Sequence, residues 1–170
     1  MSAEIVIFYI LALMAVAFGA LTVFSRMIFR SAIYLLFCMV SIAGLYFLMS
    51  MEFIAGLQIL IYVGGIIVLI IFSIFLTHKS GQKLPASKRS NLIWGGLLGV
   101  AGLALTLGVL FTHAFPQTSQ VAVDASVKTI GIQMLDYTNH GYALFFEVIS
   151  FLLLAALVGS IAIAIKDKKE

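Results

Sequence analysis

The stretch that decides the fold is MEFIAGLQILIYVGGIIVLIIFSIFLT, residues 51–77. From Phe53 to Thr77 it carries no charged residue, and about 20 apolar residues are enough for an α-helix to cross a bilayer. We therefore expect a membrane-spanning helix over residues 53–77. A helix that served only to sit in lipid would consist of plain aliphatic residues, whereas this one keeps several polar or small ones. They are Gln58, Tyr62, Gly64, Gly65 and Ser73.

Five residues of this stretch follow one another at helical steps of four, three, four and four, which places them on one face of a regular helix. They are Gln58, Tyr62, Gly65, Leu69 and Ser73. One interpretation is packing, because glycines let a second helix approach closely while amide and hydroxyl groups bond across the contact. The other is a bulge or register switch at Gly64 and Gly65, since glycine weakens a helix by about 1 kcal/mol and single-turn π-bulges tend to occur at functional sites. The second interpretation predicts a broken i to i−4 ladder within about one turn of Gly64.

Composition assigns the whole chain to the membrane. Hydrophobic residues make up 63% of the 170 residues and charged residues 10%, whereas soluble chains are about half apolar and a quarter charged. We expect an all-α integral membrane protein with a single membrane domain over 1–170. Five transmembrane helices are predicted, at about 5–24, 31–49, 53–77, 92–111 and 141–165. The net charge of +3 does not indicate nucleic acid, because the basic residues flank the spans.

The basic residues also predict the orientation. Nine of the ten lysines and arginines fall on one side of the predicted spans, and only Lys128 falls on the other. The nine are Arg26, Arg30, Lys79, Lys83, Lys88, Arg89, Lys166, Lys168 and Lys169. By the positive-inside rule the N-terminus lies outside, the C-terminus is cytoplasmic, and the loop 112–140 faces outward. Within that loop, Val127, Ile130 and Met134 have the spacing of a short surface helix.

Two further patterns bear on function. Gly95, Gly99 and Gly102 form a small-residue seam on the fourth span, which is typical of close helix packing and suggests membrane partners. Cys38 is the single cysteine, so neither a disulfide framework nor a cysteine metal site is expected. His78, His113 and His140 lie near span ends without clustered carboxylates. We expect no catalytic, cofactor-binding or metal-binding residue in this chain.

Glu147 is the residue hardest to explain by packing. It lies about 9 Å inside the outer end of the fifth predicted span. Carboxylates within a membrane are costly and are functional candidates by default. The alternative is a carboxylate near the boundary that reaches outward to water or caps an adjacent helix.

Several of these motifs together resemble the J subunit of respiratory complex I, the proton-translocating NADH:quinone oxidoreductase. The third span contributes Glu52-Phe53, Gln58, Tyr62-Val63-Gly64 and Val68-Leu69, and the fifth contributes Phe146-Glu147-Val148, Leu152-Leu153-Leu154-Ala155 and Gly159. Val127-Lys128 with Gly131 also matches. Three positions depart from the family pattern: Met27-Ile28 replaces an Asn-Pro, Phe145 replaces a common proline, and Gly65 stands where alanine is usual.

The resemblance implies a membrane-arm subunit without its own redox centre. Such a subunit would be a multi-pass protein of a bacterial inner membrane. Flavin, iron–sulfur clusters and quinone chemistry would belong to partner chains. The expected partners are the other membrane subunits of the complex, especially the small K-type and quinone-site H-type subunits, and lipid. In this family the third helix carries a π-bulge whose conversion to regular helix is proposed to gate a water path. Carried over, that switch would be Tyr62, Val63, Gly64 and Gly65. The alternatives are a subunit of a cation/proton antiporter and a purely structural membrane scaffold.

Overall fold

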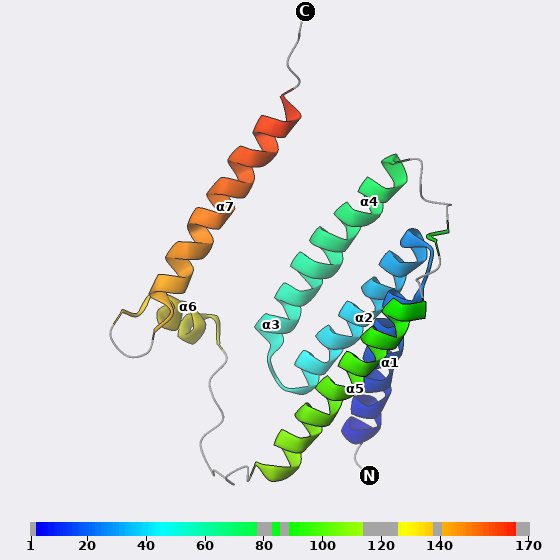
Figure 1. Cartoon of the computed structure of the whole chain (residues 1–170). Helices are drawn as coiled ribbons and strands as arrows, with labels where there is room; N and C mark the ends of the chain where they lie inside the picture. Colours follow the sequence, from blue (N-terminus) through cyan, green and yellow to red (C-terminus); the bar gives the residue numbers. More distant parts are fainter. Residues whose placement is uncertain (1–2, 78–82, 86–88, 114–125, 138–140, 166–170) are drawn as a thin grey trace, which may run out of the picture. The chain divides into compact units, whose positions relative to one another are not determined.

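The computed structural model describes residues 3–77, 83–85, 89–113, 126–137 and 141–165. The chain divides into two compact units, residues 1–121 and 122–170, and each is described by itself. The described residues are helical apart from connections and one isolated bridge between Met27 and Lys83 (Figure 1). The all-α prediction is thereby confirmed.

Five helical stretches are long and apolar enough to cross a membrane, as the sequence predicts. They are α1 (Ala3–Phe24), α2 (Ile28–Leu48), the continuous stretch α3 (Glu52–Leu57), η1 (Gln58–Ile67) and α4 (Val68–Leu76), then α5 (Arg89–Thr112) and α7 (Ala143–Ala164). The short helix expected in the loop 112–140 is present as α6 (Val127–Leu135). The apolar side chains of the spans are mostly exposed, as suits helices long and apolar enough to cross a membrane.

Small side chains let α1 and α2 pack closely. A Cβ atom added to Gly44 would lie 2.9 Å from a methyl group of Leu11, so the absence of a side chain at Gly44 makes room for the leucine. Cys38 is buried and its thiol donates a hydrogen bond to the Ala15 carbonyl at 3.3 Å.

The turn between α1 and α2 is shorter than the sequence predicts. The predicted second span starts at Ser31, but α2 begins at Ile28 and so includes Arg30. No proline interrupts this region, and a long arginine side chain can keep its charge in water while its backbone is helical. Met27, which precedes the first helical residue, makes no side-chain cap, and its amide donates to the Ser25 hydroxyl at 3.4 Å.

A tight connection around Ser50 then returns the chain along α2. Ser50 has a φ of 58°, and its amide donates to the Phe47 carbonyl at 3.0 Å. Glu52 starts α3, where a carboxylate interacts favourably with the exposed amides of a helix N-terminus. From there α3, η1 and α4 all pack against α2, so α2 has α1 and the third span as neighbours (Figure 1).

Candidate functional site

The middle of the third span is a π-helix. Residues Gln58–Ile67 form η1, whose turns are one residue wider than those of the α-helical α3 and α4 at its two ends. The segment contains Tyr62, Val63, Gly64 and Gly65, the four residues to which the family resemblance assigns a switch. A departure from the regular ladder within one turn of Gly64 is therefore present.

The two glycines contact their own helix. A Cβ atom built on Gly64 would lie 3.5 Å from the Ile59 carbonyl oxygen, and one on Gly65 would lie 3.6 Å from that of Leu60. Both are ordinary van der Waals distances, and both carbonyls belong to the residue five positions earlier. No atom of another described helix lies within 4 Å of either Cβ position. Within the described chain, these two glycines therefore do not pack against another helix.

The wider turns set which residues of the third span face α2. Ala55 and Ile67 are the buried residues of this span, with 0% and 2% exposure. A regular helix turns by about 100° per residue, so residues twelve apart would point about 120° away from each other. The wider turns of the ten-residue π segment between them change that angle, and the structure buries both side chains. The π-helix therefore lets both ends of the span bury a side chain against the same neighbour.

Residues at both ends of the π segment contact α2. At the first residue of η1, the side-chain amide of Gln58 donates a hydrogen bond to the Met39 sulfur of α2 at 3.2 Å. A thioether sulfur is a weak acceptor. Beyond the last residue of η1, the Phe75 ring of α4 lies 6.1 Å from the Phe29 ring of α2, edge to face. Tyr62 lies between them with 47% of its surface exposed. A regular α-helical register over residues 58–67 would rotate α4 relative to α3 and move the Phe75 ring with it.

Glu147 has a hydrogen-bond partner that the sequence analysis missed. In the second unit, the Tyr137 hydroxyl donates to Glu147 Oε1 at 2.9 Å. Tyr137 follows α6, and Glu147 lies in the second turn of α7. Their ten-residue separation gives no helical spacing from which to infer the pair. The sequence offers one hint of the pair, which is that the tyrosine hydroxyl of Tyr137 lies in the connection just before the span that carries Glu147.

A close backbone approach holds this connection. A Cβ atom on Gly141 would lie 1.8 Å from the Asp136 carbonyl oxygen, so no other residue fits without a rearrangement. The Tyr142 amide donates to the Gln133 carbonyl at 3.0 Å, which ties the start of α7 to the last turn of α6. Together these contacts hold Tyr137 close to Glu147.

The electrostatics of the pair keep the tyrosine protonated. The hydrogen bond to Glu147, and after it the negative charge of that carboxylate, raise the pKa of Tyr137 above its usual value near 10. Only the neutral tyrosine can donate this hydrogen bond, so Tyr137 loses its proton at a higher pH than an isolated tyrosine does. At neutral pH Tyr137 therefore remains a hydrogen-bond donor to Glu147.

The other residues that the sequence singles out are the histidines and the basic residues that predict the orientation. Among the residues that the structure describes, no three His, Cys, Asp or Glu side chains come together in a way that could hold a metal ion. His78 and His140 lie outside the described residues, as do five of the basic residues used for the orientation. Those five are Lys79, Lys88, Lys166, Lys168 and Lys169.

Comparison with known proteins places both sites in a family context. Residues 18–163 match the family model described as NADH-ubiquinone/plastoquinone oxidoreductase chain 6. An NAD(P)H-quinone oxidoreductase chain 6 from Leptolyngbya boryana is 36% identical over 165 residues, covering 96% of this chain and 81% of the relative. The NADH-quinone oxidoreductase subunit J of Buchnera aphidicola is 32% identical over 166 residues, covering 96% and 98%. The F(420)H(2) dehydrogenase subunit J of Methanosarcina mazei is 32% identical over 163 residues, covering 95% and 90%.

Proposed function

The chain belongs to the NADH-ubiquinone/plastoquinone oxidoreductase chain 6 family, and from this premise we propose that it helps couple quinone reduction to proton translocation. In this proposal it is a membrane-arm subunit of a proton-pumping NADH:quinone oxidoreductase. Its third span supplies a helix that exchanges a π-helical form for a regular one. The protein would lie in a bacterial inner membrane.

The observation that carries the proposal is the π-helix at Gln58–Ile67, midway along an apolar span. A π segment is less stable than a regular helix and can release its extra residue along the chain. The release turns α4 relative to α3, which moves side chains across the surface presented to other helices. Through such a rotation, a chain without redox chemistry can transmit a conformational change from one neighbouring subunit to another.

The relatives support a role that is separate from electron input. Their names differ in the electron donor, with NADH, NAD(P)H and F(420)H(2) among them. Similarity over nearly the whole chain despite different donors fits a subunit that does not contact the donor. Iron–sulfur clusters are held by several cysteines, and this chain has one, Cys38. Flavin and iron–sulfur clusters would therefore lie in partner chains.

The proposed partners are the other membrane subunits, especially the K-type and H-type subunits that the resemblance implies. The seam of Gly95, Gly99 and Gly102 supports such contacts. Nothing in the described chain lies within 4 Å of a Cβ atom added at any of the three. An open small-residue seam suits a helix from another subunit, because it lets two backbones come close.

Co-purification tests the proposal against its competitors. We expect the chain, carrying an affinity tag and extracted in mild detergent, to bring down subunits that contain flavin and iron–sulfur clusters. Visible absorbance and electron paramagnetic resonance would detect them. Recovery with antiporter-type subunits alone, without flavin or iron, would favour an antiporter subunit, and recovery without either would favour a scaffold.

The proposed orientation has its own test. In a Cys38→Ala background, a cysteine introduced at Ser87 is expected to react with a membrane-impermeant maleimide only from the cytoplasmic side, and one at Ser119 only from outside. Both positions lie outside the described residues, so the expectation rests on the distribution of basic residues. Labelling in right-side-out and inside-out vesicles measures it. The reverse pattern would overturn the orientation.

A further inference from the structure

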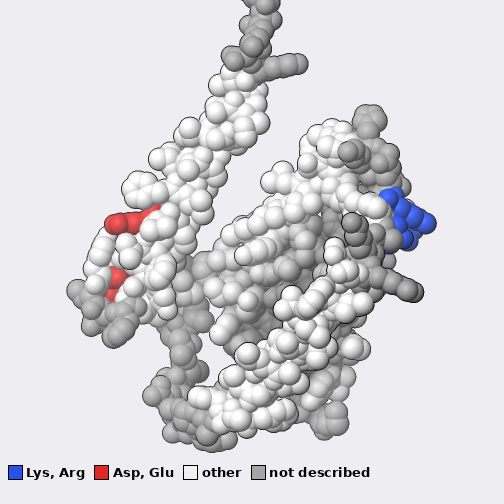
Figure 2. All heavy atoms as spheres, viewed as in Figure 1, with Lys and Arg blue, Asp and Glu red and all other residues white. Residues whose placement is uncertain are grey.

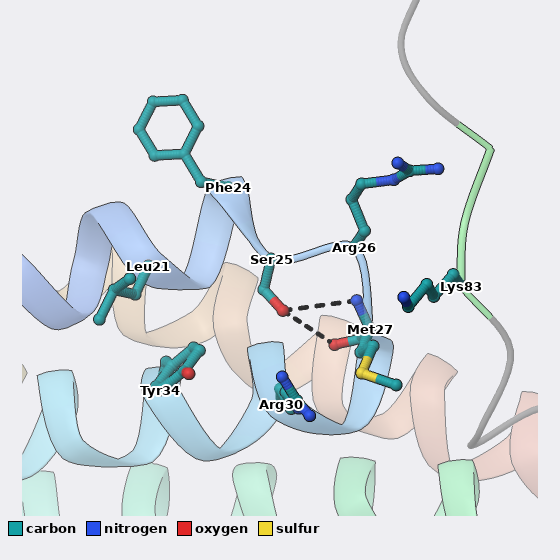
Figure 3. Close-up of a pocket in the computed structure, with 8 residues that line it drawn as sticks. All are labelled: Leu21, Phe24, Ser25, Arg26, Met27, Arg30, Tyr34 and Lys83. Carbon is teal, nitrogen blue, oxygen red and sulfur yellow. Dashed lines mark hydrogen bonds between the residues drawn. The ribbon is translucent and has the colours of Figure 1, made fainter.

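A basic cavity lies beside the turn that joins α1 to α2. It has a volume of about 380 Å³, and its lining includes three cationic side chains, Arg26, Arg30 and Lys83 (Figure 3). Among the described residues that line it, none is acidic. Basic side chains are gathered on this edge of the first unit in the space-filling view (Figure 2). The cavity therefore carries positive charge without a carboxylate of its own to balance it.

Backbone contacts hold the third cation beside the other two. Arg26 donates from Nε and Nη2 to the Leu84 carbonyl at 3.0 and 2.7 Å, and the Leu84 amide donates back to the Arg26 carbonyl at 2.9 Å. These bonds fix the residue before Leu84, which is Lys83, against the turn, where it also pairs with Met27. A guanidinium has five N–H donors, so Arg26 keeps donors beyond those that Leu84 uses.

The same cavity has an apolar side. Leu21 and Phe24, in the last turn of α1, line it with 44% and 76% of their surfaces exposed. The cavity lies where two helices long enough to cross a membrane end and begin, which places it at the boundary between hydrocarbon and water. Cations on the water side and exposed apolar groups on the hydrocarbon side match the two halves of an amphipathic ligand.

We propose that this cavity binds the phosphate headgroup of an anionic phospholipid. Arg30 and Lys83 contact the phosphate oxygens, with Arg26 beside them, and an acyl chain lies along Leu21 and Phe24. Basic pockets between spanning helices are suited to such headgroups, and each basic residue near a membrane surface strengthens binding by about fivefold. A free phosphate would use the cations but would leave the apolar wall uncovered.

Photolabelling of the intact complex tests the site. The complex is placed in nanodiscs of phosphatidylcholine with a trace of a diazirine-bearing probe lipid. The probe is phosphatidylglycerol in one sample and phosphatidylcholine in the other, and the two probes have identical acyl chains. After irradiation, mass spectrometry measures the labelled fraction of peptides from residues 21–34. We expect phosphatidylglycerol to label this segment at least about fivefold more than phosphatidylcholine. Equal labelling by the two lipids, or no labelling by either, would overturn the proposal without any variant.

Variants then assign the preference to the cations. Arg30→Gln with Lys83→Gln is expected to lower the preference for phosphatidylglycerol at least about fivefold, because Arg26 alone remains beside the cavity. The matched control Lys128→Gln, which removes a cation from the second unit, should leave the preference unchanged. Inorganic phosphate added at constant ionic strength should also leave it unchanged. If added phosphate abolishes the preference, the cavity is a site for the free ion. If the double variant keeps the full preference, these cations do not bind the headgroup. Either result contradicts the proposal.

Discussion

Replacing Gly64 with valine is expected to lower the coupled turnover of the assembled complex about fivefold or more, while its abundance changes little. Glycine at this position weakens helix preference by about 1 kcal/mol, which lets two forms lie close in free energy. A valine removes that freedom, and its branched carbons approach the Ile59 carbonyl, which lies 3.5 Å from the Cβ position in the π form. A bias of about 1 kcal/mol shifts a two-state ratio by about fivefold. Quinone reduction and proton pumping in proteoliposomes, normalised to assembled complex, measure the effect.

Two other substitutions show whether the π segment itself is responsible. Gly64→Ala should have a smaller effect than Gly64→Val, because its single Cβ atom makes only an ordinary contact. Gly56→Val places the same side chain in α3, outside η1, where nothing in the described chain lies within 4 Å of the Cβ position. We expect this control to keep near-normal turnover. If Gly56→Val is as defective as Gly64→Val, crowding of the surface explains both and the switch is not needed.

Glu147→Gln is expected to reduce proton pumping severalfold in a complex that still assembles. Glutamine keeps the length of the side chain and an oxygen that can accept the Tyr137 hydrogen bond, but it cannot carry a proton or a negative charge. Intramembrane carboxylates of this kind commonly take part in proton or ion pathways. Acidification of proteoliposomes, compared with the quinone-reduction rate of the same sample, reports the coupling. Unchanged pumping with full assembly would leave Glu147 as a boundary carboxylate.

Tyr137→Phe separates the charge from the hydrogen bond. It removes the hydroxyl that lies 2.9 Å from Glu147 Oε1 and leaves the carboxylate in place. We expect pumping to fall less than in Glu147→Gln. If Tyr137→Phe lowers pumping while Glu147→Gln, which keeps an acceptor for this hydrogen bond, does not, the pair acts by holding the connection between α6 and α7 in place.

The spans are predictable because hydropathy and charge act locally. Runs such as residues 53–77 have no stable place other than the membrane, and the helix found there begins and ends within one residue of the prediction. The adjacent glycines Gly64 and Gly65 also identify the weak point of that helix, since their effect on backbone preference needs no knowledge of neighbours. The start of α2 lies three residues before the predicted one, because a helix can carry Arg30 while the charge of that side chain stays in water.

The rest depends on contacts that the sequence does not encode by spacing. The rotation that buries both Ala55 and Ile67 follows from the π-helix and disagrees with regular helical periodicity. The partner of Glu147 depends on the backbone approach between Gly141 and Asp136, which no local pattern announces. The cavity lined by Arg30 and Lys83 joins residues more than fifty positions apart, although the distribution of charge predicts the same side of the membrane for both.

The central claim is that residues 58–67 exchange a π-helical register for a regular one as the complex works. Cryo-electron microscopy of the complex at rest and during turnover measures this directly, through the backbone hydrogen-bond register of Gln58–Ile67. The account predicts both registers, with α4 rotated relative to α3 and the Phe29 and Phe75 rings apart in the regular form. The same register in every state, in a complex that pumps normally, would contradict it.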